Sequence, residues 1–412
     1  MKTSYGHLTY CTNIHPGETW PDHFTQIKEY IPAIKKIVSP DHSFGIGLRL
    51  SDTASLELRK EKNLDAFQQW LKEQNCYVFT MNGFPYGGFH NTVVKDQVHT
   101  PDWTTSERVQ YTIRLAQILA ALLPDKMGGG ISTSPLSYRF WHDEHQTSGV
   151  FETATIHILQ VVEQMISIKK TTGKLVHLDI EPEPDGLLQT GDEFFEWYRN
   201  YLLPLGISYL KERFSYSETE AVSVLKDHVQ LCYDICHFAI GYENPDTVLQ
   251  QARDHGIRIG KIQISAALKA LLDRDNKRDT VIRAFQQFNE PTYLHQVISL
   301  QKDGQLKRFS DLPQALEKAN DPSMVEWRAH FHVPLFVQDY GVLQSTQEDI
   351  IKVLSKHKEQ PFSAHMEIET YTWDVLPSEL KLPLSQSIIR EVQWVMNRLN
   401  EDTKNDIEKT LS

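Results

Sequence analysis

Three acidic residues and one glutamine stand at or near the ends of short β-rich segments of this sequence. The acids are Glu181, Asp234 and Glu369, and the glutamine is Gln263. Carboxylates gathered at one place repel one another and are costly to desolvate unless they bind protons or a cation. With the amide oxygen of Gln263 they form an oxygen-rich ligand set that suits Mg²⁺ or Mn²⁺, and a nearby histidine such as His237 would admit Zn²⁺ or Co²⁺. The alternative is that the acids pair with lysine or arginine.

Further polar residues follow the same strands or lie in the long segment before the last strand. The histidine after the first predicted strand and the asparagine after the third could contact a substrate, or could only start a helix and a loop. Between residues 328 and 332, one arginine and two histidines alternate along a strand-like run, so all three could face one site and bind a phosphate or carboxylate. The candidate substrate-binding residues are His15, Asn82, His295, Arg328, His330 and His332.

Eight short β-rich runs alternate with longer segments whose apolar residues recur at the 3.6-residue spacing of an amphipathic helix. Strand followed by helix, repeated in this way, requires a parallel sheet, and eight units are enough to close a (β/α)8 barrel. In such barrels the active site lies at the carboxyl ends of the strands, where the acids and the glutamine would meet. The predicted strands span residues 6–11, 44–50, 76–81, 129–133, 175–181, 229–234, 257–265 and 362–369.

Capping residues mark where several of the helices should begin. Thr105, Asp192 and Asn244 each precede a segment with helical spacing, and a proline follows Asn244. Ser345 and Glu348 form the pattern of a capping box before the helix that leads to the last strand. We therefore expect helices to begin at these four places.

The chain is longer than a barrel requires. A barrel needs about 250 residues, and the surplus of this 412-residue chain lies mainly between the seventh and eighth strands, at about 266–360. We interpret the chain as a single domain, 1–412, in which this insertion covers the catalytic face of the barrel. The rival fold, an open doubly wound sheet, favours a glycine-rich turn after its first strand, whereas residues 12–16 read TNIHP.

The composition excludes several classes of protein. Apolar residues make up 40% and charged residues 23% of the chain, a balance typical of a folded globular protein. The 42 Lys and Arg against 54 Asp and Glu give a net charge of −12, which disfavours nucleic acid and anionic lipid as partners. No membrane span is expected, because no window approaches the roughly 18 apolar residues of a spanning helix. Four scattered cysteines without a CxxC pair indicate reduced thiols, so we expect a cytoplasmic protein.

The order Glu, Asp-x-x-His and Glu at the ends of the fifth, sixth and eighth predicted strands resembles the xylose isomerase-like TIM barrels, which include sugar phosphate isomerases and epimerases. Longer segments resemble, nearly end to end, the EboE-type metabolite traffic proteins of bacterial ebo clusters. These segments are GHLTYCTNIHPGETW (6–20), HLDIEPEPDG (177–186), CYDICHFA (232–239), YLHQV (293–297), RAHFHVPLF (328–336) and EIETYTW (367–373). The resemblance implies the same barrel and a small, sugar-like metabolite as the partner.

In that superfamily Glu, Asp, His and Glu from strands five to eight hold a divalent metal, and the two glutamates move a proton at a carbon next to a carbonyl. The resemblance therefore implies that Glu181 and Glu369 are the acid and base, and that Asp234 and Gln263 are the other ligands. Gln263 departs from the pattern, because a neutral amide binds transition metals more weakly than imidazole does. Either a histidine completes the shell, with His237, His330 and His332 as candidates, or metal affinity and activity are in doubt. The choice among Mn²⁺, Mg²⁺, Co²⁺ and Zn²⁺ stays open, as does assembly into a homo-oligomer.

Three hypotheses of different classes follow. The first is a metal-dependent isomerase or epimerase of a sugar or sugar phosphate in an ebo-type biosynthesis or traffic pathway. The second, favoured by Gln263, is a catalytically degenerate barrel that binds or carries a metabolite without converting it. The third is a hydrolase resembling endonuclease IV, which needs a basic groove for DNA, so the negative net charge speaks against it.

Overall fold

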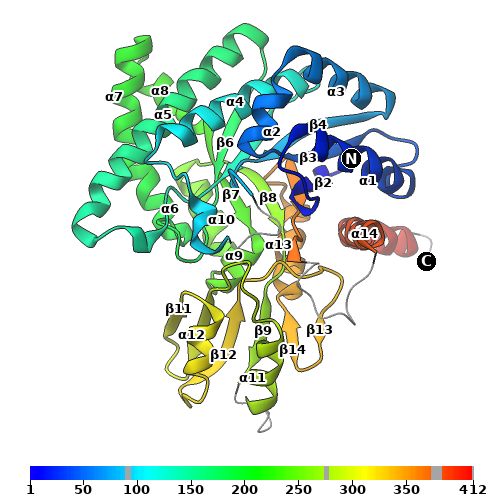
Figure 1. Ribbon diagram of the computed structural model, residues 1–412, viewed down its shortest axis with the longest axis vertical. Helices are drawn as coiled ribbons and strands as arrows, with labels where there is room; N and C mark the ends of the chain where they lie inside the picture. The colour runs from blue at the N-terminus through cyan, green and yellow to red at the C-terminus, as the bar shows by residue number, and fades with distance from the viewer. Residues whose placement is uncertain (89–93, 273–277, 373–382, 411–412) are drawn as a thin grey trace.

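All eight predicted strands are present, and they run parallel to one another in one sheet of the computed structural model, which describes residues 1–88, 94–272, 278–372 and 383–410 (Figure 1). The order along the sheet is β2, β15, β8, β7, β6, β5, β4 and β3, so each strand pairs with its neighbour in the series of eight. The predicted (β/α)8 barrel is therefore confirmed. The strands are β2 (Gly6–Tyr10), β3 (Phe44–Arg49), β4 (Cys76–Asn82), β5 (Gly129–Thr133), β6 (Val176–Ile180), β7 (Val229–Asp234), β8 (Ile259–Ile264) and β15 (His365–Ile368), and β1 (Lys2–Thr3) pairs antiparallel with β2.

The barrel closes where β2 meets β3, and most of the hydrogen bonds across this junction involve side-chain hydroxyls. One isolated parallel bridge joins Cys11 to Gly47. The hydroxyl of Thr9 accepts a hydrogen bond from the backbone N–H of Gly47 (3.1 Å) and donates to a carbonyl of β3. The hydroxyl of Thr12 accepts from the N–H of Arg49 (2.9 Å). These hydroxyls satisfy backbone groups that a regular ladder would otherwise pair.

Helices cover the outside of the barrel (Figure 1). Two of their starts agree with the sequence, since Thr105 caps α4 and Asn244 caps α10. Two predicted starts were wrong. The cap of α6 is Thr190 rather than Asp192, and Ser345 ends β14, where its hydroxyl donates to a backbone carbonyl instead of capping α13. The helices are α1 (Trp20–Val38), α2 (Asp52–Leu58), α3 (Glu61–Glu73), α4 (Ser106–Leu122), α5 (Thr147–Thr172), α6 (Gly191–Trp197), α7 (Leu203–Phe214), α8 (Glu218–His228), α9 (Ile235–Ile240), α10 (Pro245–His255), α13 (Gln347–Glu359) and α14 (Leu384–Thr410).

The insertion between β8 and β15 forms a second sheet of six antiparallel strands, in the order β11, β10, β12, β9, β14 and β13. This sheet lies beside the barrel, below it in the view of Figure 1, with α11 and α12 close to it. The interpretation of the whole chain as one domain stays a prediction. The elements are β9 (Leu268–Leu271), α11 (Arg278–Gln287), β10 (Val297–Gln301), β11 (Leu306–Phe309), α12 (Leu312–Glu317), β12 (Met324–Ala329), β13 (Asp339–Tyr340) and β14 (Leu343–Ser345).

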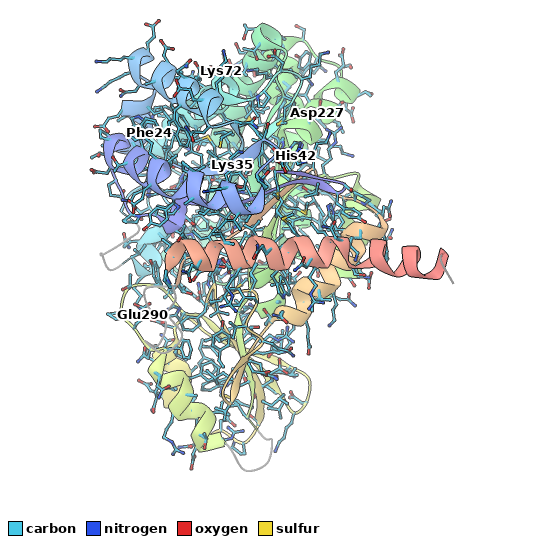
Figure 2. All side chains as sticks on the ribbon, turned by 90° about the vertical axis from the view of Figure 1, so that its right-hand side faces the viewer. Phe24, Lys35, His42, Lys72, Asp227 and Glu290 are labelled. Carbon is cyan, nitrogen blue, oxygen red and sulfur yellow. The ribbon has the colours of Figure 1, made fainter. Side chains whose placement is uncertain are left out.

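Helix α14 lies along one side of the molecule, at the level where the barrel meets the second sheet (Figure 2). It packs against α1 and α13, and its apolar stripe of Ile388, Val392, Val395 and Leu399 is buried, as the helical spacing predicts. Across the described ranges, none of the helices combines the length and the apolar character that crossing a bilayer requires.

Charged side chains fill part of the barrel interior. Lys261 on β8 and Glu367 on β15 form an ion pair, with both side chains fully buried. Asp179 on β6 pairs with a neighbouring histidine. Glycines on facing strands make the room for these groups, since a Cβ on Gly47 would overlap the carboxylate of Glu367 and a Cβ on Gly260 would overlap that of Asp179. The small and large residues of this layer are therefore matched across the barrel.

Replacing Gly47 by alanine is expected to lower the free energy of unfolding by about 1–3 kcal/mol, the usual cost of overpacking a filled interior. Gly149→Ala is the matched control, because a Cβ there meets no atom within 4 Å and lies in helix α5. Denaturant-induced unfolding of both variants and the parent measures the difference. Equal midpoints for Gly47→Ala and Gly149→Ala would contradict the packing of Glu367 against β3.

Candidate active site

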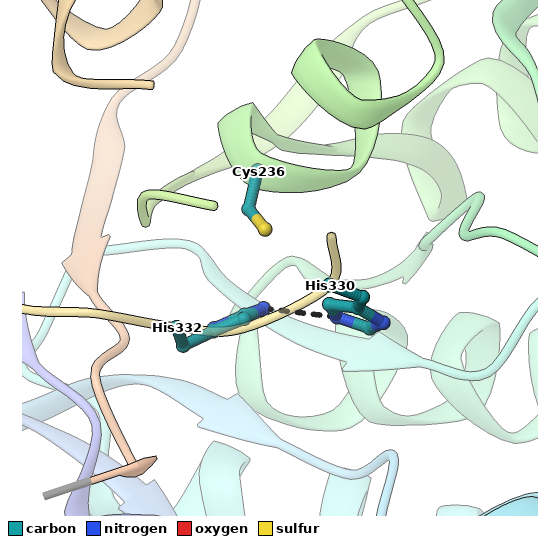
Figure 3. A group of neighbouring side chains, drawn as sticks. All are labelled: Cys236, His330 and His332. Carbon is teal, nitrogen blue, oxygen red and sulfur yellow. Dashed lines mark hydrogen bonds between the residues drawn. The ribbon is translucent and has the colours of Figure 1, made fainter. Parts of the chain in front are cut away.

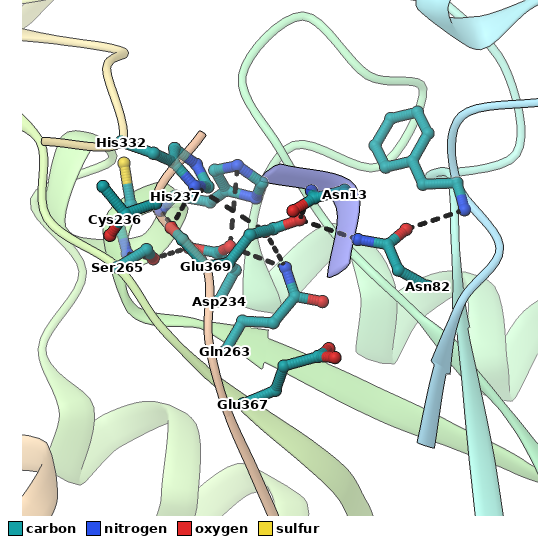
Figure 4. Close-up of polar contacts among 12 residues, drawn as sticks. Asn13, Asn82, Asp234, Cys236, His237, Gln263, Ser265, His332, Glu367 and Glu369 are labelled. Carbon is teal, nitrogen blue, oxygen red and sulfur yellow. Dashed lines mark hydrogen bonds and ion pairs between the residues drawn. The ribbon is translucent and has the colours of Figure 1, made fainter. Parts of the chain in front are cut away.

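The three acidic side chains form a cluster at the carboxyl ends of β6, β7 and β15. Figure 4 shows two of them, Asp234 and Glu369. Ligand oxygens of Glu181, Asp234 and Glu369 all lie within 4.8 Å of one another, and all three residues are buried. Two amides hold the last of them, because Asn13 and Asn82 donate from Nδ2 to Glu369 Oε1 at 2.8 and 2.7 Å. The residues of this carboxylate cluster thus come from strands far apart in the sequence.

The side chain of Gln263 lies in the middle of the carboxylate cluster. Its Nε2 lies within hydrogen-bond distance of three carboxylate oxygens, which are Glu181 Oε1 and Asp234 Oδ2, both at 3.0 Å, and Glu369 Oε2. Its Oε1 accepts from the thiol of Cys232 (3.2 Å). The sequence predicts that the amide oxygen faces the acids, and the structure has the amide nitrogen there instead.

The carboxylate cluster is short of positive charge. An amide nitrogen carries two hydrogens, so Gln263 cannot donate to three carboxylate oxygens at once. In addition, Glu181 Oε2 is buried and has no hydrogen-bond partner among the described residues. Buried carboxylate and amide oxygens at this spacing are the ligands that hard divalent cations prefer. The residues present therefore fit a divalent ion.

The pKa values of the three acids respond to their burial and to one another. Burial, followed by repulsion from neighbouring carboxylates, raises the pKa of Glu181 and of Glu369 well above its usual range. Burial alone would also raise the pKa of Asp234, but the adjacent His237 and His332 outweigh burial and lower it. Without a cation, the two glutamates are therefore the groups of the cluster that hold protons.

Three histidines border the carboxylate cluster on the side of the second sheet. His237 lies on α9, and its backbone N–H donates to Asp234 Oδ1 (3.2 Å). His330 and His332 lie on the extended run that follows β12, and His332 Nδ1 donates to the backbone carbonyl of Glu369 (2.9 Å). The insertion thus reaches the carboxyl ends of the barrel strands.

A cavity of about 60 Å³ lies beside the carboxylate cluster and the three histidines. This volume accommodates an ion with a few water molecules, or the reacting end of a small ligand. Aromatic rings of Phe84, Tyr293 and Tyr371 form part of its wall. The polar residues that line it are Asn82, Lys95, His99, Glu181, Glu183, His237, Gln296, His330, His332 and Glu369.

Three residues predicted to bind substrate are not among the described residues that line this cavity. His15 Nε2 hydrogen-bonds the hydroxyl of Tyr10 (2.9 Å). His295 Nε2 lies 2.7 Å from a carboxylate oxygen of Glu290, and its ring stacks on an aromatic neighbour. Arg328 forms ion pairs with two acids of its surroundings and lies over a tyrosine ring. The structure therefore brings together the acids, Gln263, Asn82 and three histidines, and leaves these three residues outside.

Other residues of the site were not singled out from the sequence. Asn13 holds the carboxylate cluster, Gln296 accepts a hydrogen bond from a cavity histidine (2.7 Å), and Glu183 Oε1 lies 2.9 Å from His99 Nε2. The first three fall within the segments that carry the family resemblance, which is the signal that could have found them. His99 lies in a 3₁₀ turn and had no such signal.

No family model matches the chain, and no curated protein matches it either. Solved structures do match. An L-ribulose 3-epimerase shares 9% sequence identity over 99% of this chain and 98% of its own, with a TM-score of 0.50. A xylose isomerase-like TIM barrel protein from Mycobacterium smegmatis in complex with magnesium shares 10% over 97% and 99% (TM-score 0.49), and the IOLI protein with a zinc atom shares 13% over 96% and 98% (TM-score 0.48). The chain therefore has the xylose isomerase-like TIM barrel fold, with a long insertion between its seventh and eighth strands.

Proposed function

We propose that the chain is a metal-dependent isomerase or epimerase that acts on a small sugar or sugar phosphate. The observation that carries this proposal is the buried cluster of Glu181, Asp234 and Glu369 beside a cavity at the carboxyl ends of the barrel strands. The fold supports it, because a solved structure of the same fold is an L-ribulose 3-epimerase. The sequence resemblance supports an ebo-type pathway of metabolite biosynthesis or traffic as the setting of this reaction.

The ligands of the metal would be Glu181, Asp234, Glu369 and the amide oxygen of Gln263. Half a turn of the amide would point its oxygen toward the acids and its NH₂ toward the sulfur of Cys232. A thiol can accept a weak hydrogen bond as well as donate one, so Cys232 suits either orientation. Mn²⁺ or Mg²⁺ matches this set of oxygens, whereas imidazole from His237 would be needed to favour Zn²⁺ or Co²⁺.

The glutamates would move the proton. A bound divalent ion supplies Lewis acidity toward the carbonyl oxygen of a substrate. Glu369, whose Oε1 is held by Asn13 and Asn82, would take the proton from the carbon next to that carbonyl through Oε2. Glu181, which also lines the cavity, would return a proton. Asn82, His330 and His332 would orient the hydroxyl or phosphate groups of the substrate.

Proton exchange with solvent tests this proposal. We expect the full chain, stripped with chelator and reloaded with Mn²⁺, Mg²⁺, Co²⁺ or Zn²⁺, to incorporate deuterium from D₂O at the carbon next to the carbonyl of a sugar or sugar phosphate. NMR of a panel of aldoses, ketoses and their phosphates gives the measurement, and the stripped protein is the control. Exchange that does not depend on metal would contradict the proposed chemistry.

The second candidate is a barrel that binds or carries a metabolite without converting it. The orientation of Gln263 favours it, since its amide nitrogen already occupies the centre of the carboxylate cluster. Under this alternative a member of the same panel binds in calorimetry, yet no deuterium enters with any of the four metals. Binding without exchange across the panel would therefore replace the first proposal by the second.

A further inference from the structure

Three imidazole rings converge next to the carboxylate cluster. The ring centroids of His237, His330 and His332 lie 4.8, 5.3 and 5.5 Å apart, so they form a nearly regular triangle. Nε2 of His330 is 3.2 Å from Nε2 of His237 and 3.3 Å from Nε2 of His332. Figure 3 shows the second of these contacts. All three residues are buried.

The other nitrogen of each ring identifies the tautomer. Nδ1 of His237 faces the carbonyl oxygen of Pro182 (3.1 Å), and Nδ1 of His332 faces the carbonyl oxygen of Glu369 (2.9 Å). A carbonyl oxygen only accepts hydrogen bonds, so each of these nitrogens carries the hydrogen.

The same reasoning applies to His330 through a glutamine. Nδ1 of His330 lies 2.7 Å from Oε1 of Gln296. The amide of Gln296 is itself oriented, because its Nε2 donates to the carbonyl oxygen of Pro184 (3.0 Å). Oε1 therefore accepts, and His330 also carries its hydrogen on Nδ1. A neutral imidazole has one N–H, so all three Nε2 atoms present lone pairs.

Lone pairs this close together repel one another unless a positive charge lies between them. A proton removes only part of this repulsion. A single Nε2–H on His330 could donate to one of the two neighbouring Nε2 atoms and would leave the other without a donor. A metal ion could bind all three nitrogens at once, because histidine binds metals as the neutral imidazole through the nitrogen that carries no hydrogen.

The spacing of the nitrogens matches one metal in particular. Zinc binds histidine nitrogen at 2.0–2.1 Å with tetrahedral geometry, which places two ligand nitrogens about 3.3–3.4 Å apart. The two measured separations, 3.2 and 3.3 Å, are close to this value. Hydrogen bonds from the outer ring nitrogen to oxygen acceptors, as seen for all three rings, are the usual support of metal-binding histidines.

A carboxylate is available for the fourth position. Glu183 Oε2 lies 3.9 Å from Nε2 of His237, and ligand atoms of Glu183, His237 and His330 lie within 4.8 Å of one another. Cys236 is the other neighbour of the rings (Figure 3). Its thiol donates to the carbonyl of Phe331 (3.3 Å), so it already has a hydrogen-bond acceptor in the chain.

We propose that His237, His330 and His332 bind a zinc ion through Nε2, with Glu183 as the fourth ligand on the side of the cavity. This trihistidine site adjoins the carboxylate cluster, to which the proposed isomerase function assigns its metal. With zinc bound, His330 and His332 hold the ion, and Asn82 alone of the three residues named above remains to orient the substrate. The trihistidine site joins the barrel to the insertion, since one ligand lies on α9 and two lie after β12. It does not depend on the chain being an isomerase.

Metal analysis and Co²⁺ spectroscopy of the full chain test this proposal. We expect about one zinc per chain that survives dialysis, and visible absorption typical of tetrahedral Co²⁺ after exchange. His330→Asn and His332→Asn should each lose both signals, whereas Glu181→Gln, which leaves the three rings and Glu183 in place, should keep them. Gln296→Leu removes the support of one ring and should weaken zinc binding by about 10- to 100-fold.

Two controls separate metal binding from folding. His228→Asn removes another buried histidine whose Nδ1 faces a carbonyl, and it should leave the zinc content unchanged. Chelator should lower the Tm of the parent and of His228→Asn by more than that of His330→Asn, in which only the metal of the carboxylate cluster remains to be removed. Zinc retained by both His330→Asn and His332→Asn, or lost from Glu181→Gln to the same extent as from those variants, would overturn the trihistidine site. The absence of deuterium exchange into a sugar would contradict the isomerase proposal but would not overturn the trihistidine site.

Discussion

Glu369→Gln is expected to slow deuterium exchange at the substrate carbon by about 10²- to 10⁴-fold, the usual contribution of one general acid or base. The exchange is that of whichever sugar or sugar phosphate the parent protein turns over in the presence of metal. Glutamine keeps an oxygen toward the metal and an atom for Asn13 and Asn82 to contact, but it cannot carry the proton. Exchange rates by NMR, together with Mn²⁺ affinity by calorimetry, give the measurement.

The two readouts separate the roles of this residue. An exchange rate that falls while Mn²⁺ affinity stays within a few-fold identifies Glu369 as a proton carrier. A parallel fall of both would show that it acts only as a ligand. Glu212→Gln is the matched control, because this exposed glutamate lies on α7, away from the barrel mouth, and neither quantity should change.

Lys261→Ala is expected to lower the free energy of unfolding by about 3–5 kcal/mol, the cost of leaving a buried charge without its partner. Burial alone would lower the pKa of Lys261, but the carboxylate of Glu367 outweighs burial and raises it, so the lysine is charged at neutral pH. Both side chains are fully buried in the barrel interior. Chemical denaturation at neutral pH measures the loss. Lys72→Ala, on the exposed surface of α3, should change stability by less than about 0.5 kcal/mol.

A double variant shows whether the loss comes from the unpaired charge. Removing both charges with Lys261→Met and Glu367→Leu together should recover most of the stability, because apolar groups of similar size replace a buried ion pair at little cost. If the double variant is as unstable as Lys261→Ala, packing rather than charge governs this layer of the barrel.

The sequence predicted the parts of the site that depend on strand ends. Glu181, Asp234 and Glu369 each close or follow a β-rich run, and parallel strands bring their carboxyl ends to one edge, so the cluster follows from the topology. The orientation of the Gln263 amide does not follow. It depends on hydrogen bonds to four side chains from other strands, which no pattern along the chain encodes.

In the insertion, the alternation of side chains along a strand predicts only part of what faces the site. Alternation predicts that Arg328, His330 and His332 share one face. The two histidines do line the cavity, but β12 ends at Ala329, and the chain leaves the sheet between the arginine and the first histidine. Arg328 is therefore still part of the sheet and pairs with acids of the insertion and of α13. The prediction of helix starts failed for a similar reason. The hydroxyl of Ser345 donates a hydrogen bond to a backbone carbonyl earlier in the chain and does not cap the helix that follows.

The junction of β2 and β3 is the part of the barrel wall that should open locally most often. Its backbone groups are joined by a single bridge and by the hydroxyls of Thr9 and Thr12, so its amides should exchange with solvent sooner than those of the other strand pairs. Asn13 is the next residue of the chain, and it holds the oxygen of Glu369 that faces away from Gln263. Each transient opening of this joint would therefore release the carboxylate that we assign to proton transfer. The carboxylate of Glu369 is therefore held in place only while the junction of β2 and β3 stays closed.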